Sequence, residues 1–135
     1  MIRPSLFWAT VLVAVTFLRA EISVLPGVVL EIRGNNGNSV DYRLERRVAL
    51  KVDKNEPPSA FVDAGQFESI WHGVLLLNKR ERINFSFEGF GKAKLFVAGE
   101  QVFEAEGDDL SSVESDRLRL NGGEHSFEVR YWSTP

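Results

Sequence analysis

The sequence predicts an all-β domain, arranged as an antiparallel β-sandwich or a partly closed barrel of jelly-roll type. Three observations predict this fold. Apolar residues recur at every second position over several short segments, which is the pattern of strands with one buried face. Turns rich in glycine and asparagine separate these segments. After residue 20 no segment shows the helical period of apolar residues, so strands must supply the core.

The chain has 135 residues, of which 44% are hydrophobic and 26% are charged. This length and this balance are typical of one soluble globular domain. The sequence contains no cysteine, which excludes disulfides, thiolate zinc sites and covalently attached c-type haem. A single domain over residues 21–135 therefore depends on its hydrophobic core for stability.

Residues 1–20 have the features of a signal peptide. Arg3 gives a positive start, residues 6–18 are apolar apart from two threonines, and Ala20 offers a small residue for cleavage. The apolar stretch is too short to span a bilayer comfortably. The alternative is an uncleaved N-terminal anchor or a buried hydrophobic strand. Cleavage after Ala20 leaves no membrane span and predicts a secreted, periplasmic or cell-surface protein.

The charge of the chain argues against nucleic acid as a partner. Loss of Arg3 and Arg19 with the leader shifts the formal net charge from −3 to −5. Nucleic-acid-binding proteins carry clustered Lys and Arg, whereas the basic residues here are scattered. The densest group, residues 79–82, is interrupted by Glu81, and we expect it to form a solvated turn.

The first strands are expected over residues 28–33 and 40–52. A turn rich in glycine and asparagine separates them at residues 34–39. In the second segment one face is mostly apolar, with Val40, Tyr42, Leu44, Val48, Leu50 and Val52. Charged residues occupy most of the other face. This alternation predicts a long strand half buried against the core, bent or bulged near Arg46.

Further strands follow at short intervals. Pro57 and Pro58 make a stiff connection before them. The strands are expected over residues 71–77, 82–88, 92–97, 101–105, 117–120 and 125–132. Ala98-Gly99-Glu100 predicts a tight hairpin between two of them. The polar and acidic residues 106–116 predict a loop.

Five segments, in this order along the chain, resemble the protective-antigen-type domain. They are Trp71-His72-Gly73-Val74-Leu75, Ile83-Asn84-Phe85-Ser86-Phe87, Leu95-Phe96-Val97-Ala98-Gly99-Glu100-Gln101-Val102, Leu120-Asn121-Gly122-Gly123-Glu124-His125 and Val129-Arg130-Tyr131. That family shows a Trp-x-Gly strand, a Leu-x-Val hairpin with glycine, and a glycine–histidine turn before a strand that ends in Tyr. Residues 41–67 are similar to a bacterial variant near the start of large secreted proteins that also carry a c-type cytochrome domain.

The resemblance implies a secreted β-sandwich that binds carbohydrate or glycoconjugates, or that joins other extracytoplasmic domains. Family members that bind sugar through calcium carry consecutive aspartates before the Leu-x-Val strand. This chain has Glu88-Gly89-Phe90-Gly91-Lys92 there, so the calcium mechanism is not carried over. The family also continues beyond the position of Tyr131 with another apolar strand. We therefore expect either a truncated domain or an exposed sheet edge that another chain could cover.

The acidic residues of the chain raise the question of a calcium site. Six carboxylates fall within residues 104–116, but their spacing does not match an EF-hand loop. A solvated loop is expected. The alternative is a loose calcium site that uses Asp108 and Asp109 with Asp63 from another loop. No cofactor is predicted.

No catalytic set is recognisable. His72 and His125 are the only histidines, and both are expected to be structural or surface residues. Neither a zinc-binding spacing nor a Gly-x-Ser-x-Gly motif is present. A domain of this size has little room for the deep cleft that a pair of catalytic carboxylates needs. The chain is therefore expected not to be an enzyme.

The expected function is non-catalytic binding of carbohydrate or glycoconjugate. An exposed aromatic ring can stack on a pyranose while polar neighbours bind its hydroxyls. Phe90 lies between two glycines at a turn, with Glu88 beside it, and Trp132 lies near the end of the last strand. These three residues are the candidate ligand contacts. The alternative is a structural or interaction domain of a larger extracytoplasmic protein that contains cytochrome c.

Overall fold

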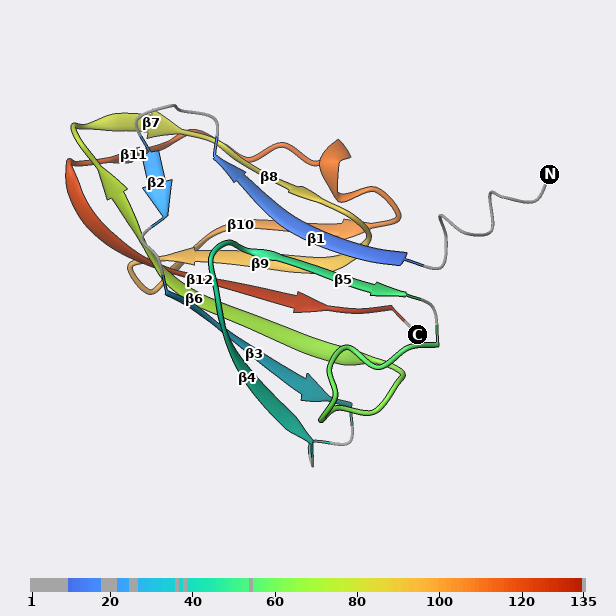
Figure 1. Cartoon of the computed structure of the whole chain (residues 1–135). Coiled ribbons are helices and arrows are strands. Elements are labelled where there is room, and N and C mark those ends of the chain that lie inside the picture. The colour runs from blue at the N-terminus through green and yellow to red at the C-terminus, as the bar shows by residue number, and fades with distance from the viewer. Residues whose placement is uncertain are drawn as a thin grey trace.

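A computed structural model describes residues 10–17, 22–24, 27–35, 37, 39–53 and 55–134. Two layers of antiparallel strands face each other across a hydrophobic core, as Figure 1 shows. Within these ranges the sheets do not close into a barrel, and the only helix is the 3-10 helix η1 (Leu110–Ser112). No helix in them has the length and apolar character of a transmembrane segment. The predicted all-β sandwich is confirmed.

The larger layer is a seven-stranded sheet, as far as the described residues define it. Its strands lie in the order β10-β9-β12-β6-β3-β4, and β2 also pairs with β6. Their bounds are β2 Ile22–Val24, β3 Val28–Gly34, β4 Val40–Glu45, β6 Phe67–Leu77, β9 Gly91–Val97, β10 Glu100–Gly107 and β12 Gly123–Trp132. β12 lies in the middle of this sheet and pairs with β6 along its whole length.

The second layer has two parts in the described chain. One is the three-stranded sheet β5-β1-β8, formed by β5 (Ala49–Asp53), β1 (Thr10–Phe17) and β8 (Phe85–Glu88). The other pairs β7 (Glu81–Ile83) with β11 (Leu118–Leu120). The single strand predicted over residues 82–88 is therefore divided at Asn84. Figure 1 shows both parts on one side of the larger sheet.

The hairpin between β9 and β10 forms where the sequence predicts it. Ala98 and Gly99 have positive φ angles of 52° and 85°, as a two-residue type I′ turn requires. An irregularity between Gln101 and Phe103 then shifts the register of β10. The hairpin keeps β9 and β10 as neighbours at one edge of the larger sheet.

The long strand expected over residues 40–52 is divided between the two layers. β4 ends at Glu45, residues 46–48 bend, and β5 begins at Ala49. Val48, Leu50 and Val52 are buried as expected, but Val40, Tyr42 and Leu44 are 39%, 64% and 74% exposed. The prediction of a half-buried apolar face is therefore wrong for β4.

Pairing with β3 determines which face of β4 is turned toward the core, and it is the face opposite to the one expected. Leu30 of β3 is fully buried, and the residue opposite it on β4 is Arg43. Residues directly opposite each other in antiparallel strands share a face. The charged residues of β4 thus lie on the inner side of the sheet, at its edge. There the Arg43 Nε lies 3.9 Å from a carboxylate oxygen of Asp41 and 3.9 Å from one of Glu45.

Part of the predicted leader lies in the second layer. Residues 10–17 form β1, whereas residues 1–9 and 18–20 lie outside the described residues. β1 runs antiparallel to both of its neighbours, with Val13 opposite Leu50 and Val15 opposite Phe87. Cleavage of the leader stays a prediction.

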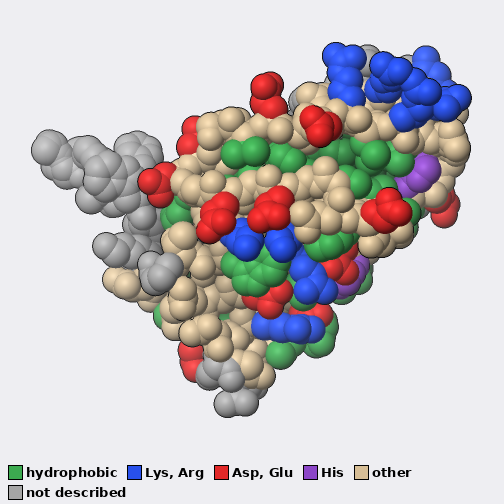
Figure 2. Space-filling model, turned by 180° about the vertical axis from the view of Figure 1, so that it is seen from behind, with side chains coloured by type: hydrophobic (Ala, Val, Ile, Leu, Met, Phe, Trp, Pro, Cys, Tyr) green, Lys and Arg blue, Asp and Glu red, His purple; other side chains and the backbone are tan. Residues whose placement is uncertain are grey.

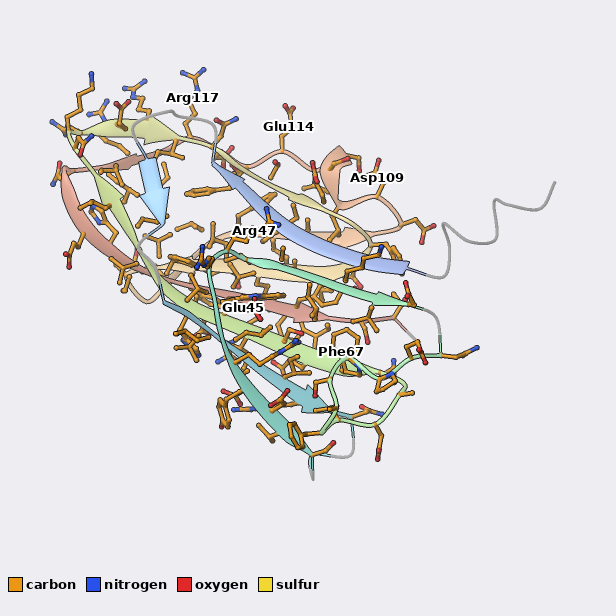
Figure 3. The ribbon with its side chains drawn as sticks, viewed as in Figure 1. Glu45, Arg47, Phe67, Asp109, Glu114 and Arg117 are labelled. Atoms are coloured by element: carbon orange, nitrogen blue, oxygen red, sulfur yellow. The ribbon has the colours of Figure 1, made fainter. Side chains whose placement is uncertain are left out.

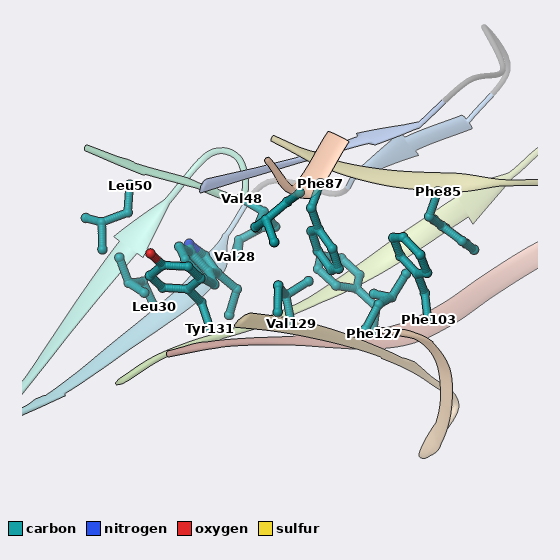
Figure 4. Packing of buried hydrophobic residues seen from close by; sticks show 14 of the residues in the cluster. Val28, Leu30, Val48, Leu50, Phe85, Phe87, Phe103, Phe127, Val129 and Tyr131 are labelled. Atoms are coloured by element: carbon teal, nitrogen blue, oxygen red, sulfur yellow. The ribbon is translucent and has the colours of Figure 1, made fainter. Parts of the chain in front are cut away.

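The core lies between the two layers and is built from both, as Figure 4 shows. The larger sheet contributes Trp71 and Val129, and the second layer contributes Leu50 and Phe87. The ring of Phe87 stacks on that of Phe103 from β10, with centroids 5.1 Å apart and planes inclined by 10°. This aromatic contact joins the two layers directly.

Tyr131 fixes one end of the core beside the turn between β8 and β9. Its side chain is fully buried, and its hydroxyl donates a hydrogen bond of 2.6 Å to the Phe90 carbonyl. Burial raises the pKa of the Tyr131 phenol, because the phenolate would lose its hydration. Gly91 has a φ of +119°, and a Cβ there would lie 2.7 Å from the Trp132 carbonyl oxygen and 2.8 Å from Tyr131. The close approach of β9 to β12 therefore requires glycine.

Replacing Gly91 with alanine is expected to destabilise the domain, since the new methyl group collides with the backbone of β12. Gly107 is the matched control, because it lies opposite Gly91, has a φ of +140° and has no atom within 4 Å of a Cβ. Both variants carry the strain of a positive φ, but only Gly91→Ala adds overpacking of roughly 1–3 kcal/mol. Urea unfolding followed by tryptophan fluorescence measures the difference. Equal losses in the two variants would contradict the packing argument.

The raised pKa of Tyr131 predicts that the domain loses stability at alkaline pH. The folded state holds the phenol proton more tightly than the unfolded state does. Its contribution is therefore complete below a pH of about 10, the ordinary pKa of tyrosine, and falls as the pH rises further. Tyr131→Phe is expected to flatten this loss, while costing about 1 kcal/mol near neutral pH through the missing hydrogen bond.

The measurement is the free energy of unfolding between about pH 8 and pH 11, the range around that ordinary pKa. Tyr42→Phe is the control, because Tyr42 is exposed on β4, and it should keep the wild-type profile. A Tyr131→Phe profile that runs parallel to the wild type throughout this range would show that Tyr131 does not govern the alkaline transition.

Candidate functional site

The side of the larger sheet that faces away from the core carries alternating charges. The strand register arranges these residues in rows that cross the sheet. One row contains Glu106, Lys92, Trp132, Glu68 and Arg33, and the next contains Glu104, Lys94, Arg130, Ile70, Glu31 and Tyr42. We call this side the outer face. In the view of Figure 2, acidic, basic and hydrophobic side chains are interleaved across the molecule.

Trp132 is the large aromatic ring at one end of the outer face. It points outward because Tyr131, the residue before it, points into the core, as the alternation of a strand requires. Its side chain is half-buried. The ammonium groups of Lys92 and Lys94 each lie 5.7 Å from the ring centroid, within the range of cation–π interactions. Two cationic side chains therefore lie close to the ring.

Two open hollows adjoin Trp132 on different sides, with volumes of about 350 and 300 Å³. The first is lined by Asn35, Gln66 and Glu68 among others. The second is lined by residues that include Lys92, Glu106 and Asp108. Trp132 therefore stands between two sets of hydrogen-bonding groups.

Acidic partners compensate several cations of the outer face. Arg33 contacts Glu31, and the Lys92 Nζ lies 3.9 Å from a carboxylate oxygen of Glu104. The hydrogen bond and the charge of Glu31 raise the pKa of Arg33. The Glu31 carboxylate is buried, whereas the Lys92–Glu104 pair is partly exposed and contributes little to stability.

A further hollow of about 410 Å³ lies over β6, β9 and β12. Its lining includes His72, Phe96, Glu128 and Arg130. The His72 Nδ1 lies 3.4 Å from a carboxylate oxygen of Glu128, and Arg130 contacts the same carboxylate. His72 is exposed, so it belongs to the outer face although its strand is largely buried.

The other histidine stabilises a turn. The His125 Nε2 donates a hydrogen bond of 2.7 Å to the Asn121 carbonyl, across the turn that leads into β12. His72 and His125 lie on different strands, and each has its own partner.

The three predicted ligand contacts do not form one cluster. Glu88 and Phe90 lie where β8 turns into β9, and the turn carbonyl of Phe90 is held by Tyr131. Glu88 is exposed and Phe90 is half-buried. Neither residue lines the two hollows beside Trp132. Trp132 is the candidate that combines an aromatic ring with surrounding polar groups.

The acidic residues after β10 have structural partners or face solvent. Asp109 accepts hydrogen bonds from the backbone and the hydroxyl of Ser111, and so caps η1, which inserts the buried Leu110 into the core. Figure 3 shows Asp109 and Glu114 pointing away from the strands.

The calcium candidates are not brought together. Asp108 is exposed after β10, and Asp63 is exposed on the loop between β5 and β6. Among the described residues no group of three or more His, Asp or Glu side chains is placed to hold a metal ion. Asp108 instead lines one of the hollows beside Trp132.

A second charged surface was not expected from the sequence. β7 and β11 pair antiparallel and place Arg82 directly opposite Arg119. Arg80 and Arg117 join them around an open hollow of about 390 Å³, together with Glu81. We call this surface the arginine corner; Figure 2 shows Lys and Arg side chains gathered at its upper right. The expectation of scattered basic residues is therefore wrong for this part of the chain.

The sequence contains only half of the signal for this surface. Arg80 and Arg82 are two positions apart, as are Arg117 and Arg119, so each pair lies on one side of its own extended segment. What brings the two pairs together is the contact between β7 and β11, which are far apart in the chain.

Arg119→Glu is expected to raise the melting temperature by a few degrees at low salt, because it replaces a pair of opposed like charges with an ion pair. High salt should remove most of the gain. Arg47→Glu is the matched control, since Arg47 is exposed on the bend between β4 and β5 and makes the same change in net charge. Thermal unfolding monitored by circular dichroism measures both variants. An equal shift in the two would assign the effect to net charge instead of to the arginine corner.

The chain matches no family model and no curated protein. Among solved structures it is similar to the α-xylosidase of glycoside hydrolase family 31 from Xanthomonas citri, with 15% sequence identity and a TM-score of 0.44. The likeness covers 87% of this chain and 15% of the xylosidase chain. This chain therefore spans a small part of that enzyme's length.

Proposed function

We propose that this chain is a non-catalytic, extracytoplasmic module that binds carbohydrate on its outer face, with Trp132 as the stacking platform. The observation that carries the proposal is the position of Trp132, a half-buried ring on the solvent side of the sheet between two hollows lined by polar groups. β12 pairs with strands on both sides, so the ring stands on a rigid element. A rigid platform loses little conformational freedom when a ligand binds.

The groups around Trp132 suit the hydroxyls of a sugar. The amides of Asn35 and Gln66 offer both donors and acceptors, the carboxylate of Glu106 accepts, and the ammonium group of Lys92 donates. The ring itself covers the apolar C–H face of a pyranose. Because the hollows are open, the face suits a glycan chain that lies across the sheet.

Three features of the sequence support this proposal. The resemblance to the protective-antigen-type domain implies carbohydrate binding, and the apolar leader implies export. The loop Glu88-Gly89-Phe90-Gly91-Lys92 lacks the aspartates of the calcium-dependent members of that family. The proposed binding mode therefore uses protein side chains without calcium.

The second candidate function is an interaction domain within a larger extracytoplasmic protein that contains cytochrome c. The specific observation in its favour is the row of exposed apolar side chains on β4, namely Val40, Tyr42 and Leu44. Val29 of β3 lies opposite Leu44 and is 40% exposed. Contiguous exposed apolar residues of this kind are typical of surfaces that another domain covers.

Trp132→Ala is expected to weaken glycan binding at least about tenfold, because the stacking surface is lost while the sheet remains. A glycan array probed with and without calcium identifies the ligand, and calorimetry with the best glycan measures the affinity. Calcium should make no difference.

Tyr42→Ala is the matched control, because it removes another exposed aromatic ring from the larger sheet, on its edge strand. Phe90→Ala tests the turn between β8 and β9 in the same way. Both variants should bind as the wild type does. Binding that survives Trp132→Ala, or a wild-type protein that binds no glycan on the array, would overturn the proposal.

A further inference from the structure

β5 and β8 depend on β1 for their strand hydrogen bonds. In the described part of the chain, the order β5-β1-β8 makes β1 the single strand partner of each. The first half of β1 pairs with β5, from Thr10 opposite Asp53 to Ala14 opposite Ala49. Its second half pairs with β8 and ends with Phe17 opposite Phe85. One eight-residue strand therefore bridges two strands that are far apart in the sequence.

This bridge lies over the hydrophobic core. Leu50 and Val52 of β5 and Phe85 and Phe87 of β8 are all buried. Positions 13 and 11 of β1 lie opposite Leu50 and Val52, respectively. Positions 17 and 15 lie opposite Phe85 and Phe87, respectively. The sequence has valine at three of these positions and phenylalanine at the fourth. A strand at this place thus needs β-branched or aromatic residues at alternate positions.

The same eight residues fall within the predicted leader. Removal of residues 1–20 would take away the neighbour that β5 and β8 share. The backbone groups of β5 and β8 that pair with β1 would then lose these partners, directly over the core. An incoming strand with the same pattern would restore these hydrogen bonds in an existing geometry, as in β-strand addition.

We propose that the gap between β5 and β8, which we call the strand slot, is an acceptor site for an extended apolar segment of another polypeptide. Residues 10–17 occupy the slot in the 135-residue chain. After export, a segment of about eight residues with β-branched or aromatic residues at alternate positions replaces them, antiparallel to both neighbours. The slot lies in the second layer, so this proposal is independent of carbohydrate binding on the outer face.

The chain has no cysteine, so one introduced thiol can report on the slot. The 135-residue chain carrying Leu50→Cys is expressed with export, and the product is mixed with a synthetic peptide of residues 9–18 that carries Val13→Cys. A disulfide between the two thiols is expected, because directly opposite residues in antiparallel strands have Cα atoms about 4.5–5.5 Å apart, within the range that a disulfide spans. The exported wild-type protein should also gain several degrees in melting temperature with the unmodified peptide, a readout that does not depend on the Leu50 variant.

A peptide with Leu12→Cys is the register control, because a shift of one residue turns the thiol to the other face of the strand. Val40→Cys on the edge strand β4 is the control for unspecific capture. Neither control should form the disulfide. The proposal is overturned if mass spectrometry finds residues 1–20 on the exported protein, since the slot is then filled permanently by its own chain. It is equally overturned if the leaderless protein captures neither peptide, or captures both alike.

Discussion

The pairing of β12 with β6 on one side and with β9 on the other is the interaction on which the rest of the structure depends. It joins β3 and β4, which precede β6, to the β9–β10 hairpin. Its alternation sends Val129 and Tyr131 into the core and Arg130 and Trp132 to the outer face. Because a slip of one residue would exchange the two faces, a single register determines both the core and the candidate binding surface.

This coupling has a consequence for function. The backbone carbonyl of Trp132 lies beside Gly91, whose missing side chain lets β9 approach β12. The hydroxyl of Tyr131 joins the same region to the turn at Phe90. Trp132 therefore lies on a strand whose backbone is paired with a neighbouring strand on both sides. Binding on such a surface relies on preorganisation, whereas binding by loops would first have to order them.

Much of the fold follows from local patterns in the sequence. The continuous apolar run of residues 71–77 predicts most of β6, and alternation predicts β9 and β12. Ala98-Gly99 predicts the hairpin from β9 to β10. Trp132 is predicted as a ligand contact because it is an aromatic residue near the end of the last strand, and its orientation in β12 places it on the outer face. Alternation shows that the two faces of a strand differ, but it does not show which face meets the core. The orientation of β4 is decided by its pairing with β3, and the arginine corner by the pairing of β7 with β11. In both cases the sequence predicts the strands but does not predict which strand pairs with which.

The leader illustrates a different limit. An apolar run rich in valine suits the core of a signal peptide and a buried strand for the same reason, its low affinity for water. Composition cannot separate these two roles. The backbone register shows that the second layer has a strand, β1, between β5 and β8.

The two edges of the larger sheet bear on whether the protein can polymerise. At one edge β4 holds Arg43 between Asp41 and Glu45 on the inner side, and at the other β10 carries a register shift and the carboxylates of Glu104 and Glu106. A second copy that extended the sheet at β4 would trap these charges, and one at β10 would meet an irregular ladder. Fibre growth from the larger sheet is thus opposed at both ends. In the second layer, a strand in the strand slot covers the inner edges of β5 and β8.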